Sequence, residues 1–243
     1  AGEHETSNPV RHFARHTIPF PSILLNYTPP QDTKLGIEEI QITSPRSNDI
    51  PKDFLDATAA HICAVDYLTQ SLLQPVLRSG EVKTITIDAH TSYMQPEYFN
   101  KLAAIVSGLT AFLVKEDDLR LFFRNRTNDL VEMAATVANL GCEMVIIHLS
   151  DGNKMLYELT TRKKWLIPMY PSARINYHSA QASFGGGLLA GYRLSFEPLQ
   201  ALKYGIITES IAAEGLHPLN MFDSLPGLAK ARINALDEMV RPI

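Results

Sequence analysis

The sequence is poor in cysteine and carries no large excess of charge of either sign. Its 243 residues include only two cysteines, Cys63 and Cys142, which both lie in apolar runs. We therefore expect buried thiols rather than a disulfide framework. The net charge of −4 argues against a general electrostatic attraction to nucleic acid or to an anionic membrane. No apolar run is long enough to span a bilayer.

The start of the chain also lacks the features of a secretory signal, because residues 1–5 are polar and acidic. We expect a cytoplasmic protein, with a cleaved organelle-targeting peptide as the alternative. His12 and His16 are four residues apart, so a helix would place them on one face, where a metal could bind. The alternative is a flexible, solvated terminus over residues 1–17, which the lack of a third ligand near the pair favours.

The composition that is present is that of an ordinary globular protein, with 45% hydrophobic and 20% charged residues. No repeat or shift in composition marks a boundary, so we expect one domain over residues 1–243. Apolar runs and amphipathic segments alternate from residue 60 onward. This alternation predicts an α/β fold, a three-layer α/β/α sandwich with a mostly parallel central sheet. The expected strands cover residues 22–27, 37–42, 60–65, 83–88, 110–114, 143–149, 155–159 and 164–170, and the expected helices cover 69–77, 96–109, 129–140, 184 onward, 198–213 and 225–240.

The most specific motif lies between residues 174 and 215. A glycine-rich helix, Phe184-Gly-Gly-Gly-Leu-Leu-Ala-Gly-Tyr192, is followed by Pro198-Leu-Gln-Ala-Leu-Lys-Tyr-Gly205. Together these segments resemble the signature region of the ribokinase-like (PfkB) carbohydrate kinases. The order of expected elements from residue 55 onward fits the same family, so the resemblance covers about three quarters of the chain. It implies a ribokinase-like fold and ATP-dependent, Mg²⁺-assisted phosphoryl transfer to an alcohol group.

In the resembling enzymes, glycines at a helix start let bare backbone N–H groups close on the transferring phosphoryl group. An aspartate at the end of that motif takes the proton from the sugar hydroxyl. In this sequence the glycines are replaced by residues with side chains, and the aspartate by alanine. The aligned positions of this anion hole are Ser179, Ala180, Gln181 and Ala182.

The alanine at the base position is the largest departure from the family. The methyl group of Ala182 accepts no proton, and losing a positioned base typically costs about 10²–10⁴ in rate. His178 and Asp151 are the nearest candidates for a substitute base. We favour the alternative interpretation of His178, a residue at the end of a strand or in the packing.

A second family motif, Asn-x-x-Glu, helps to place Mg²⁺ and phosphate, and it matches residues 115–118. Lys115 stands at the Asn position and Asp118 at the Glu position, so the resemblance implies that Asp118 could still serve as a metal-linked carboxylate. The alternative is that residues 116–118 are simply an acidic helix start, which the helix dipole favours.

Two further segments match the family site, one near the nucleotide and one in the cleft. His148, Ser150 and Gly152 match the segment near the nucleotide, although Asp-Gly-Asn is a good turn regardless of ligand. Asp88 ends a strand, where ligands bind in open parallel sheets, so it is a candidate cleft residue. Capping of the following helix is the alternative role for Asp88.

The family's N-terminal Gly-Gly-x-x-x-Asn sugar-binding motif has no counterpart here, so we expect the substrate lid to be missing and a sheet edge to need cover. Three hypotheses remain. The first is a catalytically degenerate kinase relative that binds a nucleotide or acts in regulation or assembly, possible partners being a nucleotide, a second copy or a larger assembly. The second is an active phosphotransferase on a small sugar or nucleoside, using ATP, Mg²⁺ and another base. The third is a scaffold subunit without a ligand.

Overall fold

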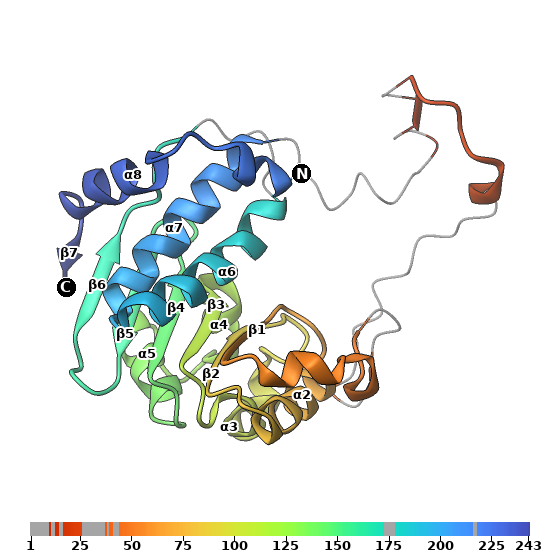
Figure 1. Ribbon diagram of the computed structural model, residues 1–243. Coiled ribbons are helices and arrows are strands. Elements are labelled where there is room, and N and C mark those ends of the chain that lie inside the picture. The colour runs from red at the N-terminus through yellow and green to blue at the C-terminus, as the bar shows by residue number, and fades with distance from the viewer. Residues whose placement is uncertain are drawn as a thin grey trace. The chain divides into compact units, whose positions relative to one another are not determined.

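The computed structural model describes residues 10, 13–14, 17–25, 37, 39–40, 44–172, 178–215 and 218–243. The chain divides into two compact units, residues 1–35 and residues 36–243. The sheet and its covering helices belong to the second unit (Figure 1). His12, His16 and residues 38, 41 and 42 of the expected strand over 37–42 lie outside the described residues, and the described residues 37, 39 and 40 form no strand.

The apolar run that begins at Ser22 does not form the expected strand in its described part. It forms a 3₁₀ helix, η1 (Ser22–Leu24), in which Leu24 N donates to Pro21 O at 3.0 Å and Leu25 N donates to Ser22 O at 3.1 Å. Pro21 has φ −66°, which suits the start of such a turn. The local i→i+3 bonds satisfy backbone groups that a strand would have to pair with a neighbour.

The second unit is built on a seven-stranded sheet whose strands follow one another in sequence order. The first four strands pair in parallel and the last three are added antiparallel, so the sheet is mixed and the expected hairpin over 155–170 is confirmed. The parallel strands are β1 (Ala59–Ile62), β2 (Thr84–Asp88), β3 (Ala111–Lys115) and β4 (Met144–His148), and the antiparallel strands are β5 (Lys154–Glu158), β6 (Lys164–Ile167) and β7 (Arg241–Pro242).

Helices cover both faces of this sheet, which confirms the α/β fold (Figure 1). One face packs against α2 (Tyr67–Ser79), α3 (Ala103–Val106), α4 (Glu116–Phe122) and α5 (Leu130–Ala138), and the other against α6 (His178–Ser195), α7 (Pro198–Glu214) and α8 (Leu228–Asp237). Shorter 3₁₀ segments are η2 (Ser47–Asp49), η3 (Lys52–Asp56), η4 (Pro96–Lys101) and η5 (Pro218–Asp223).

The two cores follow from the alternation of side chains along each strand. In β3, Phe112 and Val114 face the core beneath α4 and α5, whereas Ala111 and Leu113 face the core beneath α6 and α7. All four side chains are buried, which is why strands of this sheet have continuous apolar sequences.

Two expected helices differ from the observed ones. The helix expected over 96–109 is divided into η4 and the short α3, and the chain turns at Gly108, whose φ of +76° suits glycine. The helix expected from Phe184 begins six residues earlier, at His178. The segment aligned with the family's phosphate-binding turn therefore forms the first turn of α6.

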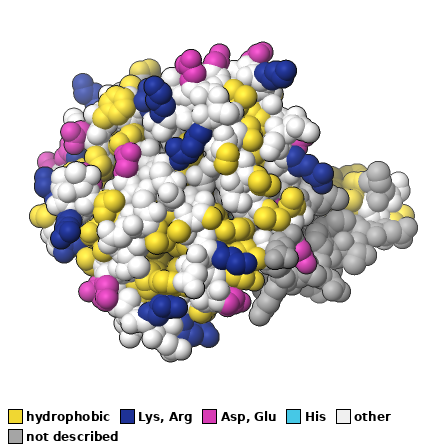
Figure 2. Space-filling view, turned by 90° about the horizontal axis from the view of Figure 1, so that it is seen from below, with side chains coloured by type: hydrophobic (Ala, Val, Ile, Leu, Met, Phe, Trp, Pro, Cys, Tyr) yellow, Lys and Arg dark blue, Asp and Glu magenta, His cyan; other side chains and the backbone are white. Residues whose placement is uncertain are grey.

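Of the two thiols, one is buried and the other is exposed. Cys142 is buried, as expected, and burial raises the pKa of its thiol to about 12, but Cys63 is exposed because β1 ends one residue before it. On the described part of the face in Figure 2, lysines and arginines are scattered among acidic and apolar side chains rather than gathered in one basic surface. No described helix combines the length and apolar character that crossing a bilayer requires.

Candidate functional site

A cavity of about 230 Å³ lies where β3 and β4 end, beside the start of β5 and the helices α6 and α7. The carboxyl ends of parallel strands are the common ligand-binding edge of open α/β sheets. Five residues expected at a site from the sequence line this cavity together: Lys115, His148, Ser150, Gly152 and Gln181. The other lining residues are Glu116, Asp117, Leu149, Lys154 and Glu209.

The sequence alone does not indicate the buried ion pair in the cavity wall. Lys154, which is 4% exposed, begins β5, and its Nζ lies 3.2 Å from Oε2 of Glu209 on α7. The same ammonium group lies 5.5 Å from the ring centroid of Phe184 on α6. The lysine is thus already bound to a carboxylate of the chain, and its charge is largely compensated before any anionic ligand arrives.

His148 forms the floor of the cavity at the end of β4. Its ring packs edge-on against Phe184, with centroids 4.7 Å apart, and its Nε2 has no hydrogen-bond partner among the described residues. Burial, together with the positive charges of Lys154 and Lys115, holds the pKa of His148 well below its usual value of 6.5. The imidazole is therefore neutral at physiological pH, with one nitrogen free for a ligand.

The turn after β4 is held by a carboxylate of α4. Ser150 donates from its backbone N–H at 2.9 Å and from its hydroxyl at 3.1 Å to Oε2 of Glu116, whose other oxygen binds Arg120. The bond from the Ser150 N–H lowers the pKa of Glu116, against the opposing effect of burial. Gly152 has φ +90°, and a Cβ there would lie 2.6 Å from the sulfur of Met169, so glycine is required for the turn itself.

Asp151, the residue of this turn that was a candidate base, is also hydrogen-bonded within the turn. Oxygens of Asp151 accept hydrogen bonds from the backbone N–H and the side-chain amide of Asn153, at 2.9 and 2.8 Å. This local bonding is typical of an aspartate that shapes a turn. Asp151 is therefore a structural residue of the turn and does not line the cavity.

Asp118 does not reach the cavity either, although the two residues before it do. Its side chain is buried and accepts a bond of 3.2 Å from the Thr91 hydroxyl, and burial raises its pKa. Asp117 is exposed at the cavity rim, and its Oδ1 lies 3.4 Å from the Ser150 hydroxyl. The described residues contain no group of three or more His, Cys, Asp or Glu side chains placed to hold a metal. Asp117 is thus the carboxylate best placed to accompany Mg²⁺, which usually binds one or two carboxylates together with phosphate oxygens.

Asp88 forms a second polar cluster, at the ends of β1 and β2. Its Oδ2 lies 3.6 Å from Nε2 of His61, whose Nδ1 is 2.8 Å from the Thr86 hydroxyl oxygen. Burial alone would lower the pKa of His61, but the carboxylate of Asp88 and the neighbouring Cys63 outweigh it and raise that pKa to about 9. Asp88 is therefore bound in an ion pair, and no described helix is capped by it.

The aligned anion-hole residues lie in the first turns of α6 and do not converge on the cavity. Ala180 is buried under α7, whereas Ala182 is exposed and Gln181 is the member that lines the cavity. The side chains of His178 and Ser179 are outside the described part of the structure. The exposed Ala182, which the resemblance aligns with the family's aspartate, has no side-chain group that could accept a proton.

Comparison of structures shows which known proteins this chain is similar to more clearly than comparison of sequences does. An aminoimidazole riboside kinase from Salmonella enterica, complexed with aminoimidazole riboside and an ATP analogue, superimposes with a TM-score of 0.58 over 79% of this chain and 67% of its own, at 14% identity. Ribokinase from Thermotoga maritima gives a TM-score of 0.57 over 79% and 61%, at 15% identity. The fold is that of the ribokinase-like carbohydrate kinases.

Sequence comparison is weaker. No protein-family model matches the chain. A cytidine kinase from Thermococcus kodakarensis is 25% identical over 146 residues, which is 59% of this chain and 50% of that protein. The chain thus spans about half the length of this curated relative. The structural comparisons therefore establish the ribokinase-like fold, and the cavity lies where parallel strands of that fold end.

Proposed function

We propose that the chain is a catalytically degenerate relative of the PfkB carbohydrate kinases that binds a nucleotide or nucleoside weakly and serves in regulation or assembly. The observation that carries this proposal is Ala182, an exposed methyl group at the position of the general base. A base that is absent costs about 10²–10⁴ in rate, and each missing oxyanion donor costs on the order of 10²–10³ more. A location in the cytoplasm belongs to the same proposal.

The charges around the cavity support weak phosphate binding. Lys115 and Lys154 stand against Glu116, Asp117 and Glu209, which leaves a net charge of −1 in the lining. A polyphosphate would bring more negative charge to a site in which Lys154 and Ser150 are already bound to carboxylates. The neutral His148 and the apolar Leu149 suit an uncharged part of a ligand instead.

Assembly is supported by the end of the sheet. Among the described strands, β1 pairs only with β2, so one side of its backbone has no strand neighbour. Edge strands of this kind are natural sites for the addition of another strand. A second copy of the chain, or a larger assembly that covers this edge, is the partner that we propose.

An active phosphotransferase on a small sugar or nucleoside is the second candidate. It is favoured by the fold itself and by the loose transition state of phosphoryl transfer, in which positioning supplies much of the catalysis. Such an enzyme would need a base at a position other than 182. Asp151 already accepts hydrogen bonds from Asn153. A pure scaffold subunit is the third candidate, and it predicts no nucleotide binding.

An isothermal titration with ATP–Mg²⁺, followed by an assay for ADP release with a panel of sugars and nucleosides, tests these candidates. We expect weak binding and no sugar-dependent ADP release. Release of ADP that depends on an added sugar would contradict the proposal and favour the active enzyme. The absence of binding of both ATP and adenosine would also contradict it and favour the scaffold.

A variant sharpens the titration. Glu116→Gln removes one negative charge from the cavity but leaves an amide oxygen for the Ser150 N–H. If charge is what weakens phosphate binding, ATP affinity should rise about fivefold, the effect of roughly 1 kcal/mol. Glu132→Gln, on α5 and outside the cavity lining, is the matched control and should leave ATP affinity unchanged. Equal affinity in the two variants would refute the charge argument.

A further inference from the structure

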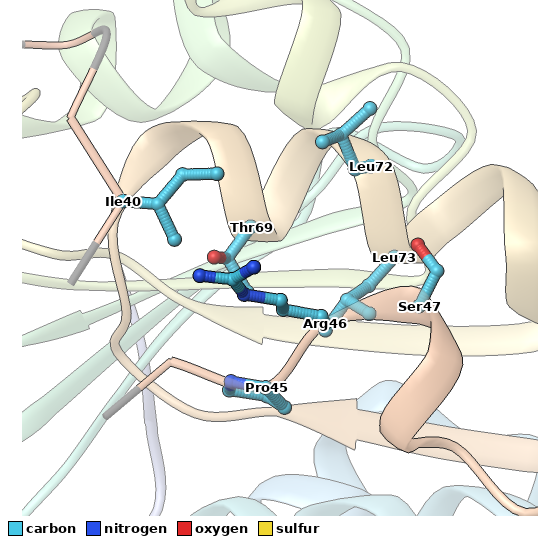
Figure 3. Close-up of a pocket in the computed structure, with 7 residues that line it drawn as sticks. All are labelled: Ile40, Pro45, Arg46, Ser47, Thr69, Leu72 and Leu73. Atoms are coloured by element: carbon cyan, nitrogen blue, oxygen red, sulfur yellow. The ribbon is translucent and has the colours of Figure 1, made fainter. Parts of the chain in front are cut away.

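A second cavity, of about 240 Å³, lies along α2, and it is separate from the cavity at the strand ends. Figure 3 shows its walls: the segment from Pro45 to Ser47 on one side and Thr69, Leu72 and Leu73 of α2 on the other, with Ile40 closing one end. Most of this lining is aliphatic. A volume slightly below the usual range for drug-sized ligands suits a small molecule or fragment.

A single cation accompanies these apolar walls. The Arg46 side chain extends over α2 between Ile40 and Thr69 (Figure 3). Its guanidinium group has no ion pair with a described residue, because the nearby carboxylates are used elsewhere. Asp49 accepts from the backbone N–H of Arg46 at 2.7 Å, and Asp66 accepts from Thr69, once from its backbone N–H and once from its hydroxyl.

The cavity is held open by the fold rather than by a ligand. Asp66 caps α2 through the 2.8 Å bond from Thr69 N, and the same carboxylate accepts a hydrogen bond from the hydroxyl of Ser44, just before the Pro45–Ser47 wall. One buried aspartate therefore fixes both walls relative to each other. Preformed walls avoid the entropic cost of ordering a site when a ligand binds.

Two of the apolar side chains that line this cavity are exposed. Leu72 on the outer face of α2 is 54% exposed, and Ile40 is 43% exposed. Both would lose contact with water if an aliphatic or aromatic group entered the cavity, and burial of apolar surface is favourable. The unpaired guanidinium would bind a carboxylate, for which its planar fork of donors is well suited.

From this combination we propose that the cavity between α2 and residues 45–47 binds a small monocarboxylate with an apolar body, whose carboxylate pairs with Arg46. The apolar body lies against Leu72, Leu73 and Ile40. Besides Arg46, the polar side chains of the lining are the hydroxyl groups of Ser47 and Thr69. This site is independent of the proposed nucleotide binding, because the two cavities have no lining residue in common.

Methyl-selective NMR of the full chain provides the test, with sodium hexanoate as the probe. We expect the methyl resonances of Ile40, Thr69, Leu72 and Leu73 to shift saturably, and those of Leu188 on α6 to stay in place. Hexanamide and hexylamine have the same apolar body without the negative charge, and they should bind several-fold more weakly. Arg46→Gln should weaken hexanoate binding about fivefold, since an exposed ion pair contributes up to about 1 kcal/mol.

Arg124→Gln is the matched control, because Arg124 is an exposed arginine that is not part of this lining. It should bind hexanoate as the unchanged chain does. Leu72→Asn tests the apolar wall and should weaken hexanoate and hexanamide equally. The proposal is overturned if hexanoate causes no localised shifts, if hexanamide binds as tightly as hexanoate, or if Arg46→Gln leaves the affinity unchanged.

Discussion

Replacing Asp88 by asparagine should change how the stability of this protein depends on pH. Asp88 and His61 form an ion pair of 3.6 Å between side chains that are 11% and 9% exposed. Burial opposes the charge on His61, but the carboxylate of Asp88, together with the neighbouring Cys63, outweighs it, and the pKa of His61 is about 9 rather than 6.5. Asparagine keeps the size of the side chain and removes the charge, so the pKa of His61 should fall sharply.

The sign of the effect follows from proton linkage. The folded state binds the His61 proton more tightly than the unfolded state, whose pKa is near 6.5. The resulting stabilisation is fully present below pH 6.5 and is lost as pH rises through about 9. A pKa that rises from 6.5 to about 9 corresponds to on the order of 3 kcal/mol, at 1.36 kcal/mol for each pH unit. The Asp88→Asn variant should lack most of this pH-dependent stability.

Urea denaturation at pH 6 and at pH 10 measures the free energy of unfolding of the unchanged chain and of the variant. Groups that titrate in both proteins cancel when one free energy is subtracted from the other. We expect Asp88→Asn to cost far more at pH 6 than at pH 10. Asp223→Asn, at an exposed position, is the control and should have no such pH dependence. An equal loss at both pH values, together with an NMR titration that places the His61 pKa near 6.5, would refute the reasoning.

Two further substitutions test packing. Gly185→Ala should cost about 1–3 kcal/mol in denaturant unfolding, because its methyl group would collide with the His61 ring. Gly186→Ala has open space and should be neutral or gain up to about 1 kcal/mol from helix propensity, so equal behaviour of the two would contradict the packing. Glu214→Gln weakens the paired bonds of 2.9 and 2.8 Å from Arg232, at a cost of about 1–3 kcal/mol. Hydrogen exchange should accelerate in α8 and not in β3; a uniform change would count against this role.

The parts of the fold that the sequence predicts well are those in which local pattern and final environment agree. The runs that form β3 and β4 are apolar on both faces, and such strands lie within a sheet covered on both sides. Because parallel strand ends converge, Lys115, His148 and Ser150 could be expected at one site before their contacts were known.

What the sequence could not supply depends on distant partners. Lys154 and Glu209 are 55 residues apart, and nothing local in either segment indicates that they form a buried pair. The pairing of His61 with Asp88 likewise requires the register of β1 on β2. The direction of a side chain is equally hidden: Asp118 belongs to the same acidic turn as Glu116, but it points away from the cavity because one helical step separates a buried face from an exposed one.

The glycine-rich helix that carries the family resemblance is weak evidence for catalysis, because its glycines have a packing role in this structure. A Cβ at Gly187 would collide with Thr208, and one at Gly191 would lie 2.6 Å from the Tyr204 Cβ, so both glycines allow α6 to approach α7 closely. Such a helix pair would keep these glycines whether or not a phosphoryl group is ever transferred. The proposed loss of activity rests instead on the start of α6, where Ala182 offers only a methyl group. The resemblance therefore supports the scaffold, and the ATP titration has to decide the activity.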